Sequence, residues 1–318
     1  MTAAEFKTQI PVKPQIAFPH VLIATDFSEA SQRALCSALT LAGDTAAEFS
    51  IIHVLQPDWR YATLENPPEI DLQRVDAEQQ LKSLIQDVPH RDIHIVLVRN
   101  PHVAEAVASV INESDVDLLV LGTRGRGGLS KLALGSVAEE LLRLAPCPVM
   151  TFGPKADVAS RLHGPGFHSI LFATDFGPGS IAALPLTLAL ARTHQAKLIL
   201  LHMIPPMPAT AGSLSAYAPP AAAADELEEW ETATRKRALQ RLKQCLPKGT
   251  ELDQAPEYVV GTDFLPEGIL TAADRFKVDL IVMGANRAGA PRAAAHTPWS
   301  AVHEIVSRAA CPVLTVAG

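Results

Sequence analysis

The chain is poor in aromatic residues, lacks a long hydrophobic run and carries no excess of positive charge. Aromatic residues make up 5% of the sequence although 48% is hydrophobic, so we expect cores built from aliphatic side chains. No apolar run reaches the roughly 18 residues that a membrane helix requires, and we predict no membrane span. The net charge of -7 argues against nonspecific nucleic-acid binding, which requires basic faces.

Targeting signals and cysteine motifs are also missing. The first residues show no cationic start followed by an apolar block, so we predict no secretory signal and a cytoplasmic location. The four cysteines form no C-x-x-C pair and no metal-binding spacing, and we expect them to be small buried residues in a reducing compartment. They are Cys36, Cys147, Cys245 and Cys311.

A glycine-rich cationic stretch, Gly122 to Ser136, stands out in this acidic chain. It follows the apolar run at 118–121 and contains Arg124, Arg126 and Lys131 but no acidic residue. A strand, a glycine-rich loop and then a helix form a common phosphate site, because backbone N–H groups and the helix N-terminus point at the anion. The Walker pattern G-x4-G-K-[ST] and the dinucleotide pattern G-x-G-x-x-G are both absent, so the loop belongs to neither class.

Short apolar runs alternate with segments of helical periodicity along the whole chain, which predicts βαβ units with parallel strands. In the first half we predict strands at 20–24, 49–55, 93–98, 118–121 and 149–152. The helices that we predict between them cover about 28–42, 70–88, 103–114 and 137–144.

The second half repeats the first. Ala-Thr-Asp-Phe at 24–27 returns at 173–176, and His53 returns as His202, an offset of 149 in both cases. The runs at 117–122 and 145–149 return at 279–284 and 309–313. Matched blocks in the same order indicate an internal duplication in which both copies share one fold. We place the first domain at 18–152, a linker at 153–166 and the second domain at 167–318. A charged helix is predicted at 225–246, after a long Pro/Ala loop.

The spacing Gly-x2-Gly-x9-Gly-Ser, met by Gly122, Gly125, Gly135 and Ser136, resembles that of the ATP-binding class of the universal stress protein family. The resemblance covers both halves and is stronger in the first. It implies an α/β fold with two tandem doubly wound, parallel, five-stranded sheets of order 3-2-1-4-5, which is adenine nucleotide alpha hydrolase-like, and helices on both faces. Ligands of such sheets bind at the carboxyl ends of the strands where the order reverses, here strands 1 and 4.

This resemblance implies ATP with Mg²⁺ as the ligand of the first half. The glycines let the backbone approach phosphate oxygens, and the three cations either offset phosphate charge or are simply solvated. The backbone near Val54 is expected to meet adenine, while Asp26 either binds a ribose hydroxyl, helps to hold Mg²⁺ through water, or only caps the following helix. The predicted set is Ala24, Thr25, Asp26, Val54, Leu121, Gly122, Arg124, Gly125, Arg126, Gly135, Ser136 and Val137.

The second copy departs from this pattern. Gly284 is kept, but Arg287 stands in place of Gly125 and Trp299 in place of Gly135. We expect the second site to be closed, weakened or turned to another ligand. His53 and His202 lack a second ligand nearby in sequence, and we interpret both as structural residues beside the crevice.

The fifth strand of each copy, an apolar strand at a sheet edge, is expected to pair with its counterpart. We therefore predict an intramolecular pseudo-dimer; pairing of two chains and an unknown protein partner stay open. The function indicated is that of an ATP-binding stress-response protein with at most slow hydrolysis. The alternatives are a slow ATP hydrolase or nucleotidyl-transfer enzyme, and an interaction scaffold that binds no nucleotide.

Overall fold

The computed structural model describes residues 18–42, 46–57, 71–86, 88, 92–123, 134–156, 166–204, 220–285 and 299–317. For 220–227 and 299–300 it describes the helical backbone alone. The glycine loop at 124–133 lies outside the described residues, as do most of the linker predicted at 153–166 and the segment at 286–298.

Strands and helices alternate through the first half, as the sequence periodicity predicts. Every predicted strand and helix is present, with ends that differ by up to three residues. The elements are β1 (His20–Ala24), α1 (Glu29–Ala42), β2 (Glu48–Leu55), α3 (Leu72–Ile85), β3 (Ile93–Arg99), α4 (Val103–Glu113), β4 (Leu118–Gly122), α5 (Ser136–Leu144) and β5 (Val149–Phe152).

The second half repeats this order of elements. The charged helix begins at Pro220 rather than at residue 225 as predicted. The elements are β6 (Ser169–Ala173), α7 (Pro178–Thr193), β7 (Lys197–Ile204), α8 (Pro220–Cys245), β8 (Glu257–Thr262), α9 (Leu265–Arg275), β9 (Leu280–Ala285), α10 (Trp299–Arg308) and β10 (Val313–Ala317).

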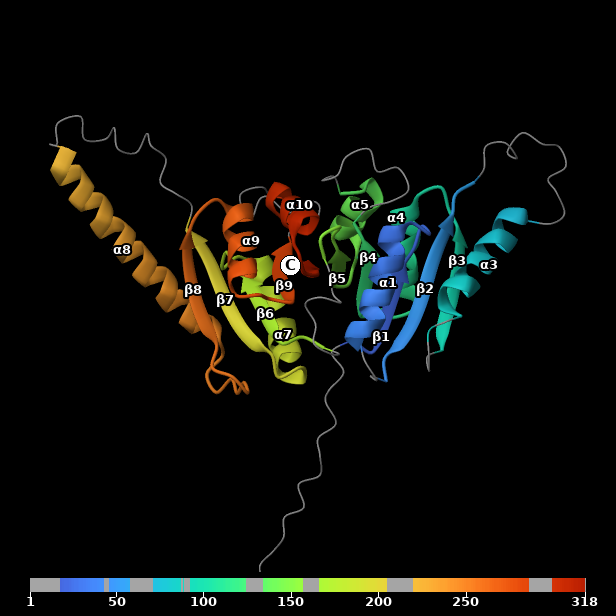
Figure 1. Cartoon of the computed structure of the whole chain (residues 1–318), viewed down its shortest axis with the longest axis horizontal. Helices are drawn as coiled ribbons and strands as arrows, with labels where there is room; N and C mark the ends of the chain where they lie inside the picture. The colour runs from blue at the N-terminus through green and yellow to red at the C-terminus, as the bar shows by residue number, and fades with distance from the viewer. Residues whose placement is uncertain are drawn as a thin grey trace, which may run out of the picture.

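All these strands lie in a single sheet with the order β3-β2-β1-β4-β5-β10-β9-β6-β7-β8 (Figure 1). Within each half the strands are parallel and follow the predicted order 3-2-1-4-5. The two predicted five-stranded sheets are thus joined edge to edge, with β3 and β8 at the outer edges (Figure 1).

The two halves meet through an antiparallel pair of strands, β5 and β10, so the predicted pairing of the two edges is confirmed. Leu314 lies opposite Met150 at the centre, and the register is symmetric about this pair. On either side, the Thr151 hydroxyl donates to the Val313 carbonyl and the Thr315 hydroxyl donates to the Val149 carbonyl, each at 3.2 Å. Both threonine side chains are buried, so the junction is part of the core.

Two hydrophobic cores cover the two faces of the sheet, and each continues across the junction. Strands covered on both faces carry near-continuous aliphatic runs, which matches the apolar runs in the sequence. One core includes buried residues of α4, α5, α9 and α10. The other includes residues of α1, α3, α7 and α8. The junction therefore joins two cores as well as two strand edges.

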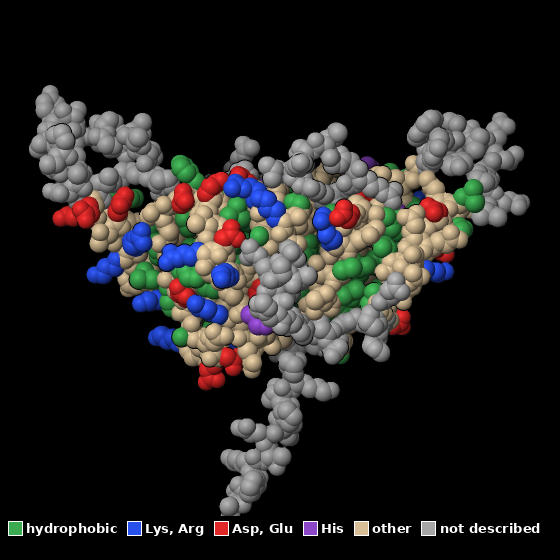
Figure 2. All heavy atoms as spheres, viewed as in Figure 1, with side chains coloured by type: hydrophobic (Ala, Val, Ile, Leu, Met, Phe, Trp, Pro, Cys, Tyr) green, Lys and Arg blue, Asp and Glu red, His purple; other side chains and the backbone are tan. Residues whose placement is uncertain are grey.

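The cysteines are only partly buried as predicted. Cys147 and Cys311 are buried, but Cys36, also expected inside, is exposed. On the face shown in Figure 2, acidic and basic side chains of the described residues are mixed rather than separated into one basic stripe. Within the described ranges, every helix is too short or too polar to cross a lipid bilayer.

Candidate functional site

A tight turn follows β1 at the carboxyl edge of the sheet. The Thr25 N–H donates to the Ile52 carbonyl at 3.0 Å, which holds the turn against the neighbouring strand. Phe27 has φ 64°, a left-handed conformation that is unusual for a bulky side chain. Its N–H donates to Thr25 Oγ1 at 3.1 Å. The threonine hydroxyl thus stabilises a backbone conformation that propensity alone would disfavour.

A histidine on β2 stabilises this turn. The rings of Phe27 and His53 have centroids 4.3 Å apart. His53 Nδ1 lies 2.8 Å from the Thr25 carbonyl, and because a carbonyl only accepts, this nitrogen carries the proton. The second half has the same arrangement: His202 contacts the Phe176 ring at 4.4 Å and the Thr174 carbonyl at 2.8 Å. These contacts give both histidines the structural role predicted from the sequence.

Asp26 accepts a hydrogen bond from the Ser28 N–H at 3.0 Å, within the turn. Burial opposes the charge on this carboxylate, but hydrogen bonds from Ser28 and Ser31 outweigh burial and lower the pKa of Asp26. Ser28 in turn caps α1, because its hydroxyl accepts from the Ser31 N–H at 3.3 Å. These contacts correspond to the capping role considered for Asp26; the ribose and Mg²⁺ roles remain predictions.

Gly122, the last residue of β4, packs directly against the first turn of α1. A Cβ at this position would lie 2.6 Å from the Ala30 carbonyl oxygen and 2.9 Å from the Ser31 nitrogen, closer than real Cβ contacts allow. Gly284 repeats the situation, because its Cβ would lie 2.2 Å from the carbonyl carbon of Gly179. The approach of helix to strand therefore explains both glycines, whereas the glycine spacing predicts phosphate contact for Gly122.

The two ends of the glycine loop are tied together. The Gly135 N–H donates to the Thr123 carbonyl at 2.9 Å, and the Thr123 N–H donates to the Phe152 carbonyl at 3.2 Å. Gly135 is the N-cap of α5 and offers no side-chain acceptor to the first N–H groups of that helix. Ser136 and Val137 follow on an exposed first turn. Since the N-cap residue supplies no acceptor, the first N–H groups of α5 and the positive end of its dipole are suited to an anion.

Strand pairing brings the described members of the predicted set to one edge. Ala24 lies opposite Ile52 on β2 and opposite Leu121 on β4, so the carboxyl ends of β1, β2 and β4 are adjacent. The predicted residues on β1, β2 and β4 therefore lie where the strand order reverses. Those at the start of α5 are linked to this point by the hydrogen bond between Gly135 and Thr123. Arg124, Gly125 and Arg126 lie outside the described residues.

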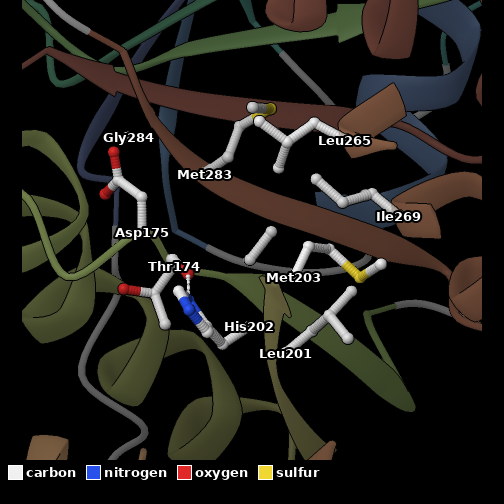
Figure 3. A pocket seen from close by; sticks show the side chains of 10 residues that line it. Thr174, Asp175, Leu201, His202, Met203, Leu265, Ile269, Met283 and Gly284 are labelled. Atoms are coloured by element: carbon white, nitrogen blue, oxygen red, sulfur yellow. Dashed lines mark hydrogen bonds between the residues drawn. The ribbon is translucent and has the colours of Figure 1, made fainter. Parts of the chain in front are cut away.

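The second half contains a cavity of about 170 Å³ at the same place in its own sheet. Figure 3 shows its polar residues, Thr174, Asp175 and His202, on one side and its aliphatic and thioether side chains on the other. Of the three outcomes expected for the second site, closure does not hold for its described part, while a weakened site and a different ligand stay predictions. The cavity is lined by Ala173, Thr174, Asp175, Leu201, His202, Met203, Leu265, Ile269, Met283 and Gly284.

Each lining residue has a counterpart in the first half, at the offset of 149 for β6 and β7 or of 162 for α9 and β9. Five of the ten counterparts are identical and five are apolar replacements. The identical counterparts are Ala24, Thr25, Asp26, His53 and Gly122. The replaced ones are Ile52, Val54, Val103, Val107 and Leu121.

This correspondence includes six residues of the predicted set and adds others that the sequence argument missed. Val103 and Val107 match the α9 residues Leu265 and Ile269, which line the cavity. Their signal was weak, because apolar residues four apart on the first turns of a helix are typical of any core-facing helix. In the second half, the packing of α9 over the strand ends brings this helix face to the cavity. The matching face of α4 carries Val103 and Val107.

Comparisons with known proteins match this architecture. A sequence model described as the universal stress protein family matches residues 17–152 and again 166–317. A universal stress protein of Thermus aquaticus is 30% identical over 136 residues, which are 42% of this chain and 97% of that protein. A universal stress protein A homologue of Coxiella burnetii is 29% identical over 140 residues, covering 42% of this chain and 94% of its own length.

Among solved structures, that of a universal stress protein from Archaeoglobus fulgidus has the same fold over almost the whole chain. Its TM-score is 0.58 with 19% sequence identity, and the match covers 94% of this chain and 98% of that one. The two relatives described above are matched over a length close to one half of this chain, whereas the Archaeoglobus fulgidus structure matches both halves.

Proposed function

Because the chain belongs to the universal stress protein family, we propose that its first half binds ATP with Mg²⁺ and acts as a nucleotide-dependent regulator in the stress response. Adenine lies beside Val54 and Leu121, the ribose lies near Asp26, and the phosphates lie between the glycine loop and the start of α5. The second half binds no triphosphate. Domain limits of 18–152 and 167–318 accompany this proposal.

The observation that carries the proposal is the correspondence between the predicted set and the cavity. Six of the residues chosen from the sequence of the first half, all on the side proposed for base and sugar, match residues that line a cavity in the second half. The hydrogen bond from the Gly135 N–H to the Thr123 carbonyl places the start of α5, whose N-cap has no side chain, next to the end of β4. These contacts support a site for base and sugar at this edge of the first half, with the phosphates toward α5.

A binding role fits the chemistry better than rapid hydrolysis. A general base should have a pKa near the working pH, but hydrogen bonds lower the pKa of Asp26 despite its burial. The Asp26 carboxylate also serves the turn through Ser28. We therefore assign the first half to nucleotide binding and release, with slow turnover at most, and a change of loop order as the signal.

The test places a negative charge at the start of α5. An acidic residue in the first turn of a helix is favourable for the helix dipole, so Ser136→Asp should fold normally. The same charge would repel the phosphates, and we expect ATP to bind about 100-fold more weakly. Ser300→Asp, the matched variant in the second half, should leave ATP binding unchanged. Calorimetric titration of the full chain with ATP and Mg²⁺ measures both.

Two results would contradict the proposal. One is ATP binding that is unaffected by Ser136→Asp while circular dichroism shows an intact fold. The other is the absence of ATP binding by the wild-type chain at millimolar nucleotide, which would favour the interaction scaffold. Rapid ATP turnover that is lost in Ser136→Asp would instead favour the hydrolase.

A further inference from the structure

Helix α8 carries an exposed arm at the outer edge of the second half. Figure 1 shows the helix leaning away from the sheet, with its N-terminal end clear of the other labelled elements. Its C-terminal part is anchored, because Ala238 and Leu242 are buried and the Arg241 guanidinium lies 4.2 Å from the centre of the Phe176 ring. In residues 220–233, which we call the arm, every described side chain is exposed. We infer that this arm binds a second copy of the chain, with the two α8 helices antiparallel.

Helix α3, the counterpart of α8 in the first half, is shorter. At an offset of 161 the buried residues Ala77 and Leu81 of α3 match Ala238 and Leu242 of α8. Helix α3 has 14 residues and begins at Leu72, whereas α8 has 26 residues. At this offset α3 begins where the arm ends. The fold that the two halves share therefore does not need the arm.

The charges of α8 are separated along its length. The arm contains acidic residues and no basic one, and the rest of the helix contains basic residues and no acidic one. The acidic residues are Asp225, Glu226, Glu228, Glu229 and Glu231, and the basic residues are Arg235, Lys236, Arg237, Arg241 and Lys243. The helix dipole favours such charges only in the first and last turns. Here the separation reaches the middle of the helix, so the dipole does not account for it.

The opposite charges are too far apart to neutralise one another within the helix. Ion pairs stabilise a helix when the residues are three or four positions apart, and only Glu231 and Arg235 have this spacing. The Arg235 guanidinium instead donates to the Val260 carbonyl at 3.2 Å. In α3, by contrast, Arg74 pairs with Glu78 at 3.1 Å. A helical arm that is exposed on all sides and lacks such pairs is marginal in water, and contact with a partner would stabilise it.

A second α8 supplies the missing opposite charges. When two copies are antiparallel and cross at Ala233, the acidic arm of each lies along the basic part of the other. Glu229 then faces Arg237 of the second copy, which favours an ion pair. Trp230, which is 41% exposed, faces Lys236 of the second copy, and an ammonium group is attracted to the face of an indole ring. A two-fold interface repeats every contact, so each of these forms twice.

A second copy fits α8 better than a partner of one charge does. A basic protein would suit the arm but would be repelled by the rest of the helix, and a nucleic acid would be repelled by the arm. An antiparallel copy is complementary to both parts, and such complementarity gives specificity. The basic part is also accessible, because Lys236 and Arg237 are exposed.

The experiment measures the oligomeric state of the full chain by sedimentation equilibrium. We expect a dimer at low ionic strength, with a dissociation constant that rises at least about tenfold in molar salt, because salt screens exposed charges. Glu228→Lys with Glu229→Lys, the arm variant, and Lys236→Glu with Arg237→Glu, the base variant, each make like charges meet. We expect each to dimerise at least about 100-fold more weakly.

A mixture of the two variants is the decisive sample. The lysines of the arm variant then meet the glutamates of the base variant, while the remaining contact keeps its natural charges. We expect a heterodimer, measured by sedimentation with one variant labelled. Restored association also shows that both variants are folded, which circular dichroism checks independently.

Lys82→Glu with Lys155→Glu is the matched control. Both lysines are exposed and lie outside α8, and the change in net charge equals that of the base variant. This control should dimerise as wild type does, and loss of its dimer would overturn the inference in favour of an effect of net charge. The inference is also overturned if wild type is a monomer at high micromolar concentration and low salt. A folded arm or base variant that dimerises normally, or a mixture without heterodimer, overturns it as well.

Discussion

The two halves of the chain share the residues that build the turn after the first strand, and they differ at several positions that would hold a ligand. Both keep the Thr-Asp-Phe turn, the histidine beneath it and the glycine at the end of the fourth strand. The second half has replaced two glycines of the phosphate pattern and five residues of the cavity wall. Each half thus serves as a control for the other, because a residue common to both cannot by itself explain triphosphate binding in one.

This comparison changes the meaning of Gly122. It is the first glycine of the phosphate spacing, yet Gly284 occupies the same structural position in a half without that spacing. Both glycines allow a helix start to approach the strand. The positions that the second half has changed, Gly125 and Gly135, are better candidates for ligand contact, because the fold has persisted without them.

The largest expected effect comes from adding a methyl group at these two structural glycines. Gly122→Ala and Gly284→Ala each place a Cβ against helix backbone, which cannot move aside as a flexible side chain could. We expect each to lower the free energy of unfolding by about 3 kcal/mol. Urea denaturation, followed by circular dichroism, measures both.

Unequal losses of stability in Gly122→Ala and Gly284→Ala would contradict the same structural role for the two glycines. If Gly122→Ala left stability unchanged but abolished ATP binding, its glycine would serve the ligand rather than the fold. Ser136→Asp serves as the control, because it alters the anion site without crowding α1.

A smaller effect is expected from the pH dependence of His202. Burial lowers its pKa below the ordinary histidine value of 6.5, and the nearby Arg241 adds to this shift. The unfolded chain therefore binds more protons just below pH 6.5, and the stability present above that pH is lost as the pH falls toward the folded pKa. His202→Asn, whose amide can still donate to the Thr174 carbonyl, should show a shallower loss between about pH 8 and about pH 5.

Thermal unfolding of both proteins over this pH range measures the difference. His194, whose pKa is also lowered by burial, contributes to both curves equally and so cancels in the comparison. Parallel curves for wild type and His202→Asn would show that the pKa of His202 is the same in the folded and the unfolded chain, as for a solvated side chain, contrary to the arrangement described.

The strand order and the edge pairing could be predicted from the sequence because they depend on local apolar runs and on a repeated family pattern. The sequence predicts β5 at Val149–Phe152, as the structure has it, since prolines and glycine bound the run. The start of α8 differs from the prediction, because its first turn at Pro220 is rich in alanine and proline, a composition typical of loops.

The base side of the site was predictable only in part. Thr25 and Asp26 are next to each other at the end of a strand, so the sequence shows them together. The side chain of Met203 packs directly on Gly261 and Gly268, which are about 60 positions away in the sequence, and no local pattern reveals this contact. The same is true of Gly122 and Ala30.

The most direct test of the central claim is the number of ATP molecules bound per chain, counted by dialysis with labelled ATP and Mg²⁺. The asymmetry between the halves predicts one ATP per chain, which Ser136→Asp removes and Ser300→Asp does not. Two ATP molecules per chain, or a single ATP lost in Ser300→Asp instead, would contradict the assignment of the triphosphate site to the first half.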